Sequence, residues 1–424
     1  MFGPASDLVV GALWFAALAA LVGVAVCWHR LNGHGLKMIL ARLGTQVGAS
    51  MLVVLAVASL LNQQNGWYGS WSDLGRDLSG ASPSVQRTAV KGQAQVEQEY
   101  DPRGAQAADD AAQLRFGAQR STFQRKTPLR PNPAPTGQYI RVVVPGLGPA
   151  AGKRAGKVLI WLPAEYLTGP HDRTFPVIQA YAGVPGGPDD YDKRMQLQKM
   201  IVTATQTSGL LSPIVVIPDY TPSKLDTECT DSAAIGMESW LNKTVPDWVV
   251  AHLRVRPDRQ SWAVMGYSAG GYCAAMSVFL HPQRFGAAML FGSYNSPILS
   301  NWHPWGSYPK WPARYNLLDT VRHRPPPVDV WIEVSTGDRF SEPASAALIR
   351  AVRTPTSLTA VYLRGAGHRF DVWASAMPRS LAWLARTLPG FGAYTGVAVS
   401  SPTLHGPHRF KQVVAGIAKR SPTG

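Results

Sequence analysis

Two long apolar runs stand near the start of the chain. Residues 8–28 and 43–61 contain no charged side chain. Each run is near the roughly 20 residues that a helix needs to cross the hydrocarbon layer of a membrane. A buried helix of a soluble protein is the alternative for either run, and a cleaved signal peptide is a second alternative for the first. Because no Lys or Arg precedes residue 8 and no clear cleavage site follows, the pair favours two membrane spans.

The residues around these runs predict their orientation. The loop between the runs carries basic charges only, at Arg30, Lys37 and Arg42. Basic loops tend to stay in the cytoplasm, so the chain after the second run is expected outside the cytoplasm, tethered to the cell membrane. Three aromatic residues that follow the second run are expected to form a belt at the outer membrane interface: Trp67, Tyr68 and Trp71.

Beyond residue 138, short apolar runs alternate with helical ones. Residues 139–144 and 157–162 predict an opening antiparallel pair of strands. Further strands are predicted at residues 177–181, 214–217, 261–265, 287–291, 328–334 and 358–363, and helices at residues 195–205, 237–253, 269–280, 343–352 and 372–388. Strands buried on both faces are continuous apolar runs, and this alternation is typical of a parallel sheet covered by helices. We therefore predict one doubly wound, mostly parallel α/β domain over residues 138–389.

Three other regions surround this domain. Residues 1–74 are expected to be the anchor with both spans. Residues 75–137 are rich in Gln, Ala, Ser, Pro and Arg, and predict a polar basic linker with a helical part at residues 105–119. Residues 390–424 predict a flexible basic tail.

The overall charge indicates which partners to expect. Charged residues make up only 16% of the chain, which fits partial immersion in a membrane, and 41 Lys and Arg against 26 Asp and Glu give a net charge of +15. The linker and tail are expected to be solvated, or to attract anionic lipid or a cell-wall polymer. The basic residues are spread out and no recognition motif is found, so nucleic acid is not expected as a partner.

A serine at the junction of a predicted strand and helix is the first candidate catalytic residue. Ser268 lies within Gly-Tyr-Ser-Ala-Gly, directly after the apolar run at residues 261–265 and before a small-residue helix. Such a turn projects the hydroxyl from the sheet, flanking glycines allow close backbone approach, and the helix N-terminus favours a developing oxyanion. The alternative is an ordinary packed Gly-Ser turn. The setting favours Ser268 as a nucleophile.

A serine hydroxyl needs a base, and in this architecture the chain order is serine, acid, histidine. His368 lies in a Gly-rich loop after the last predicted strand, where a base can reach the turn. Three rivals fit less well: His281, His303 and His323.

The acid should follow the strand at residues 328–334. Asp338 stands at its carboxyl end, where a carboxylate can orient the imidazole. Glu342 is the alternative acid, although helix capping is its simpler role. The backbone N–H groups of Ala269 and of Val184, in the Gly/Pro-rich loop at residues 181–187, are expected to form the oxyanion hole. A plain turn is the alternative for the second of these.

Residues 138–389 resemble the "putative esterase" family of α/β-hydrolases, which includes S-formylglutathione hydrolases and mycolyltransferases. The resemblance is carried by Gly-Tyr-Ser-Ala-Gly-Gly at 266–271, His-Pro-Gln-Arg-Phe at 281–285, Ala-Gly-His at 366–368 with Trp373 behind it, Ala-Gly-Val at 182–184 with Asp-Asp-Tyr at 189–191, Asp-Thr-Glu-Cys at 226–229, and Tyr-Cys at 272–273. The last two are similar to membrane-anchored family members of actinobacteria. The resemblance implies an α/β-hydrolase fold with ester chemistry. Mycolyltransferases use a glutamate where Asp338 stands here, and an arginine where Pro185 stands, so mycolyl transfer is less clearly implied.

Two cysteines and an aromatic insertion remain. An exported domain favours a disulfide between Cys229 and Cys273, and two separate buried thiols are the alternative. A Trp- and Pro-rich stretch follows the strand at residues 287–291, and is expected either to pack structurally or to form a substrate cap with Trp302, Trp305 and Trp311.

These features predict an enzyme that needs no cofactor or metal. The favoured function is a membrane-tethered, extracytoplasmic serine esterase with Ser268, His368 and Asp338 as its triad. The alternatives are an acyltransferase that moves an acyl group to a sugar or lipid hydroxyl of the cell envelope, and an inactive hydrolase fold that serves as a scaffold.

Overall fold

A computed structural model of the chain describes residues 3–31, 33, 35–92, 126–148, 155–298 and 311–392. In this part, the order of strands in the sheet is β1-β9-β8-β7-β6-β4-β5-β3-β2. Strands β4 (Val177–Tyr181), β5 (Ile214–Pro218), β6 (Trp262–Tyr267), β7 (Ala287–Phe291), β8 (Asp329–Ser335) and β9 (Ser357–Leu363) run parallel to their neighbours among these six. The predicted doubly wound α/β fold is confirmed.

Both edges of the sheet are antiparallel. The predicted opening pair forms β2 (Gln138–Pro145) and β3 (Ala155–Leu162), with Ile140 opposite Ile160, and β3 continues antiparallel to β5. At the other edge, β1 (Val85–Lys91) pairs antiparallel with β9. The expectation of a linker through residues 75–137 was therefore wrong at β1. This strand was missed because edge strands can be mostly exposed, and β1 carries a mixed polar sequence without an apolar run.

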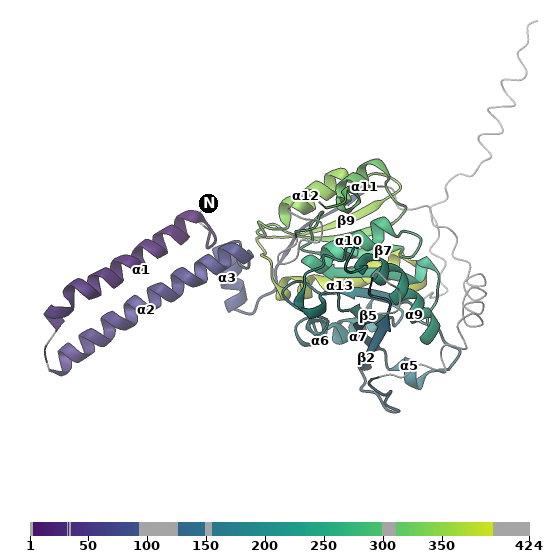
Figure 1. Ribbon diagram of the computed structural model, residues 1–424, viewed down its shortest axis with the longest axis horizontal. Helices are drawn as coiled ribbons and strands as arrows, with labels where there is room; N and C mark the ends of the chain where they lie inside the picture. The colour runs from purple at the N-terminus through teal and green to yellow at the C-terminus, as the bar shows by residue number, and fades with distance from the viewer. Residues whose placement is uncertain are drawn as a thin grey trace, which may run out of the picture. The chain divides into compact units, whose positions relative to one another are not determined.

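Helices cover both faces of the sheet (Figure 1). One face packs against α7 (Leu197–Thr207) and α13 (Phe370–Thr387). The other packs against α10 (Ala269–Leu280), α11 (Leu317–His323), α12 (Glu342–Ala351) and the predicted helix at residues 237–253. That last helix is divided into α8 (Met237–Ser239), a π-helical turn (Trp240–Thr244) and α9 (Val245–His252). The apolar strands place this core on both sides of the sheet, because their side chains alternate between its faces.

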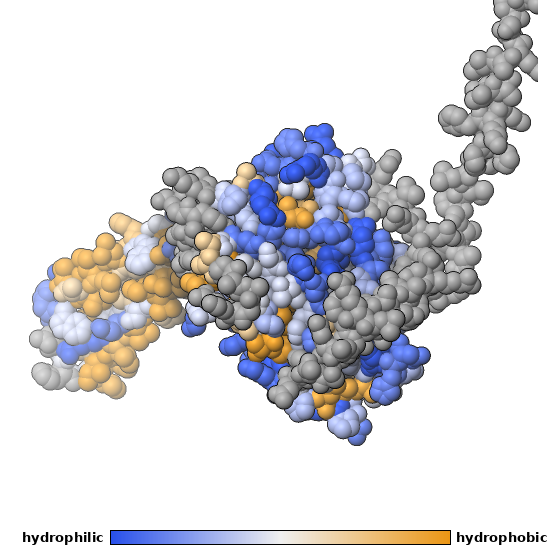
Figure 2. All heavy atoms as spheres, turned by 45° about the vertical axis from the view of Figure 1, so that its right-hand side comes forward, coloured by the Kyte–Doolittle hydropathy of each residue, from blue (hydrophilic) through white to orange (hydrophobic). Residues whose placement is uncertain are grey.

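Two apolar helices precede the sheet, α1 (Asp7–Cys27) and α2 (Leu36–Asn65). Both are long and apolar enough to cross a membrane, and only 11% of the most apolar window of each is buried. Figure 2 shows hydrophobic residues covering this pair, whereas hydrophilic residues dominate the visible face of the α/β part. Ser59 donates a hydrogen bond to the carbonyl oxygen of Pro4, and Gln63 donates to that of Ala5, so the start of α1 lies beside the end of α2.

Several expectations fall outside the described residues. These are the helix at residues 105–119, most of the basic linker and the tail beyond Gly392. After α2, a short helix α3 (Trp71–Leu78) leads toward β1.

Candidate active site

Ser268 occupies a sharp turn between β6 and α10. Its backbone has φ 55° and ψ −124°, a conformation that costs a non-glycine residue free energy and is typically found at functional sites. A Cβ atom on Gly266 would lie 1.9 Å from the carbonyl oxygen of Gly270, so this turn requires glycine before the serine. The N–H of Ser268 donates to the carbonyl oxygen of Phe291 at 2.9 Å, which ties the turn to β7.

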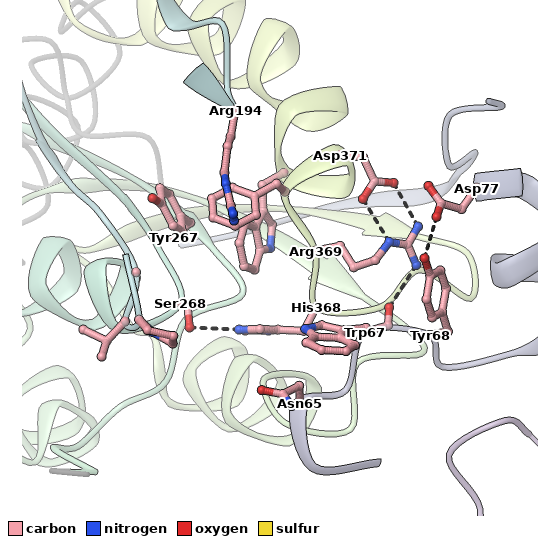
Figure 3. A pocket seen from close by; sticks show the side chains of 15 residues that line it. Asn65, Trp67, Tyr68, Asp77, Arg194, Tyr267, Ser268, His368, Arg369 and Asp371 are labelled. Atoms are coloured by element: carbon pink, nitrogen blue, oxygen red, sulfur yellow. Dashed lines mark hydrogen bonds and ion pairs between the residues drawn. The ribbon is translucent and has the colours of Figure 1, made fainter. Parts of the chain in front are cut away.

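His368 faces this serine from the loop between β9 and α13 (Figure 3). Its Nε2 lies 2.9 Å from Ser268 Oγ, although 100 residues separate the two in the chain. The rings of Phe340 and Trp373 meet the imidazole edge-on, with centroids 5.2 and 4.8 Å away. These aromatic contacts restrict the imidazole to an orientation in which Nε2 can accept the serine proton.

Asp338 completes a chain of three hydrogen-bonded side chains. Its Oδ2 lies 2.7 Å from Nδ1 of His368, and its side chain is fully buried. Oδ1 accepts the backbone N–H groups of Phe340 and Ser341, and the Ser341 hydroxyl donates to Oδ2. Burial alone would raise the pKa of Asp338, but the hydrogen bonds from His368 and Ser341 and the charge of the imidazole lower it overall. The carboxylate therefore stays ionised and holds the His368 proton on Nδ1.

The two residues predicted for an oxyanion hole lie around the same serine. Ala269 is the first residue of α10, where the N–H groups of the first turn lack partners within the helix. Val184 lines the pocket together with Ser268, and a Cβ atom on Gly183 would lie 3.1 Å from Ser268 Cβ. The loop at residues 181–187 thus lies against the nucleophile turn, as an oxyanion hole requires.

A second carboxyl group, Glu333 on β8, is buried close to Asp338. It accepts hydrogen bonds from the Ser335 hydroxyl and from the N–H of Gly292. Burial raises the pKa of Glu333 to about 8, and the charge of Asp338 adds to the rise, although the hydrogen bonds oppose it. Glu333 is therefore protonated at neutral pH in the folded state, whereas it is ionised in the unfolded chain.

This difference predicts a pH-dependent stability. Stability from the protonated Glu333 is fully present below pH 4.5, its unfolded value, and is lost as the pH rises through about 8. Relative to Glu333→Gln, the wild type should lose roughly 3–5 kcal/mol of unfolding free energy between about pH 5 and 9. Denaturant unfolding of the detergent-solubilised chain measures this, with the partly exposed Glu165→Gln as control. Parallel pH profiles for the wild type and Glu333→Gln would contradict it.

The structure also tests the cysteine and aromatic expectations. Cys229 and Cys273 form a disulfide, which joins the loop after β5 to α10. Trp302 and Trp305 lie outside the described residues. Trp311 packs against the hydrophobic core, and it is not among the described residues that line the pocket at Ser268. A cap involving these tryptophans stays a prediction.

A cavity of about 700 Å³ opens beside Ser268 and His368. Part of its lining comes from residues that the sequence did not single out for the site: Asn65, Asp77, Arg194, Arg369 and Phe370. Trp67 and Tyr68 also line it, although we expected them only as a membrane belt. Trp67 and Tyr68 were noticed in the sequence as an aromatic cluster. Their spacing, however, does not indicate that they lie beside residues about 300 positions later in the chain.

The parallel sheet, the helices on both faces and the strained serine turn define an α/β-hydrolase. The comparison with family models places the chain more closely: residues 150–384 match the model described as "Putative esterase", and the chain belongs to this family. The family match associates the chain with ester chemistry.

Individual relatives are distant. An uncharacterized protein of Corynebacterium glutamicum is 29% identical over 150 residues, and the match covers 35% of each chain. The chain thus spans about a third of the length of that curated relative. Among solved structures, an S-formylglutathione hydrolase from Agrobacterium tumefaciens is similar with a TM-score of 0.50 and 17% identity, over 63% of this chain and 99% of that one. MPT51 of Mycobacterium tuberculosis has a TM-score of 0.43 and 16% identity, over 59% and 99%. Likeness at these identities concerns the fold.

Proposed function

We propose that this chain is a serine esterase, anchored by α1 and α2 in the cell membrane with its catalytic domain outside the cytoplasm. The observation that carries the proposal is the continuous hydrogen-bonded chain from Ser268 Oγ through His368 to buried Asp338. The family match supports ester chemistry. The basic loop between the two helices and the Cys229–Cys273 disulfide support an exported domain.

The reaction follows from the positions of these groups. Ser268 Oγ attacks the ester carbonyl carbon while its proton passes to Nε2 of His368. Asp338 stabilises the resulting imidazolium, and the N–H groups of Ala269 and Val184 stabilise the oxyanion. When the carbon–oxygen bond breaks, His368 returns the proton to the leaving alcohol. Water then attacks the acyl-enzyme with His368 as base, which releases the acid and regenerates Ser268.

A membrane-impermeant fluorophosphonate tests nucleophile and topology together. We expect intact cells that carry the wild type to be labelled, Ser268→Ala to be unlabelled, and Ser375→Ala, a serine on α13 outside the pocket lining, to be labelled like the wild type. Labelling of Ser268→Ala would exclude this serine. Labelling of the wild type only after lysis would place the domain in the cytoplasm.

A further inference from the structure

The catalytic pocket is built from two parts of the chain that lie far apart in sequence. Ser268, Gly183 and Val184 come from the loops of the sheet, and residues 368–371 come from the loop before α13 and its first turn. The opposite part comes from residues 65–78, which begin at the last residue of the apolar hairpin and which we call the post-hairpin segment. It contributes Asn65, Trp67, Tyr68 and Asp77 to the lining.

The post-hairpin segment is fastened to the loop that carries His368. The N–H of His368 donates to the carbonyl oxygen of Gly66 at 2.8 Å. Next to it, Arg369 donates to the carbonyl oxygen of Trp67 at 2.9 Å (Figure 3). Arg369 also forms an ion pair with Asp73 at 2.7 Å. The Asp73 side chain is fully buried and that of Arg369 is only 9% exposed, so this pair is a fixed part of the structure rather than a surface contact.

The loop that carries Asp338 also contacts the outer end of the hairpin. A Cβ atom on Gly69 would lie 2.0 Å from the carbonyl oxygen of Gly337, so the two backbones touch directly before the acid. Directly after it, Arg339 donates to the carbonyl oxygen of Ala5, next to the start of α1. The loop that carries Asp338 and the loop that carries His368 therefore both contact the same end of the hairpin.

The position of these contacts at the end of α2 determines how far the pocket lies from the predicted membrane. The apolar run ends at Leu61, and Asn65 ends the helix four residues later, about 6 Å further along its axis. Asn62, Gln63, Gln64 and Asn65 are polar, and Trp and Tyr are the residue types that favour the boundary between lipid and water. If α2 spans the membrane, the pocket lies at the bilayer surface.

We propose that the pocket-lining side chains of the post-hairpin segment form the acyl-binding wall of the active site, which takes its ester from the surrounding membrane leaflet. The substrate class is an amphiphilic ester with a long acyl chain that resides in the bilayer. This inference rests on the proposed esterase function and on anchoring by α1 and α2. Aromatic side chains supply the apolar surface that such a chain requires. In the described pocket lining, Trp67 is exposed and Tyr68 and Phe370 are partly exposed, and the buried rings of Tyr267 and Trp373 lie behind them.

The first test uses the full chain reconstituted in phosphatidylcholine vesicles, with p-nitrophenyl palmitate dissolved in the bilayer. Delivery from the leaflet predicts that the rate follows the mole fraction of the ester in the membrane. Adding phosphatidylcholine at constant total ester should therefore lower the rate. A rate that ignores this dilution overturns the inference. Fluorophosphonate labelling of the same vesicles separates the two proposals, because an unlabelled wild type defeats the esterase function itself.

The second test compares two exposed tryptophans of the post-hairpin segment. Trp67 lines the pocket and Trp71 does not. Trp67→Ala should lower kcat/KM for the palmitate about tenfold or more, and that for water-soluble p-nitrophenyl acetate less than about twofold, because only the long chain reaches the lost wall. Trp71→Ala, which also removes an interfacial aromatic, should leave both esters within about twofold. Equal effects of Trp67→Ala on the two esters, or none on the palmitate, overturn the inference.

Discussion

Replacing His368 by alanine should lower kcat for a carboxylic ester by about 10⁵–10⁶-fold. Without the imidazole, the Ser268 hydroxyl loses the base that lies within reach of it in the described part of the chain, Nε2 at 2.9 Å. The remaining rate then comes only from ester binding and the N–H groups around the turn. Steady-state hydrolysis of p-nitrophenyl acetate by the purified full chain measures the loss.

The double variant Ser268→Ala/His368→Ala tests whether the two residues act as one unit. Its kcat should lie within a few-fold of either single variant, since removing one member already disables the nucleophile. The control is His323→Ala, because His323 is exposed at the end of α11 and was one of the rival histidines in the sequence. If the loss of kcat in the double variant were the product of the two single losses, or if His323→Ala alone caused a large loss, His368 would not be the base.

The sheet could be predicted from the sequence because its central strands are buried on both faces. The strands at residues 177–181 and 287–291 have the bounds predicted. Every residue in them is buried, and both runs are apolar apart from Gln179, which is the pattern of a strand covered on both faces. The serine turn was predictable for a related reason. A strand followed by a glycine-flanked serine and a small-residue helix is typical of a nucleophile turn. Asp338 and His368 were then predicted from their positions after the ends of later strands.

What the sequence did not indicate depends on contacts between distant segments. β1 is held by its pairing with β9, and its own residues show no strand-like apolar pattern. The π-helical turn at Trp240–Thr244 interrupts a helix that the sequence predicted as continuous over residues 237–253. Trp67 has the sequence context of a membrane belt. Its place in the pocket lining depends on contacts with the loop of His368, such as the hydrogen bond to its carbonyl oxygen from Arg369, 302 residues away. Contacts between segments that are distant in the chain cannot be predicted from the local pattern of a single sequence.

Replacing Asp338 by asparagine should lower kcat by about 10⁴-fold with little change in the fold. Asparagine keeps the volume of the side chain, and its oxygen can still accept the N–H groups of Phe340 and Ser341. Its amide nitrogen, however, can donate toward Nδ1 of His368, which drives the imidazole proton to Nε2. That tautomer points a proton at Ser268 Oγ and cannot accept one, and the imidazolium also loses its counter-charge.

Two measurements separate this role from a merely structural one. Denaturant unfolding of Asp338→Asn should show stability close to the wild type, whereas kcat collapses and the KM for p-nitrophenyl acetate changes little, because the carboxylate acts in the transition state rather than in ester binding. Glu342→Gln, the rival acid at the start of α12, is the matched control and should retain wild-type kcat. If Glu342→Gln lost activity while Asp338→Asn retained it, the acid would be Glu342, and the 2.7 Å contact between Asp338 and His368 would be structural only.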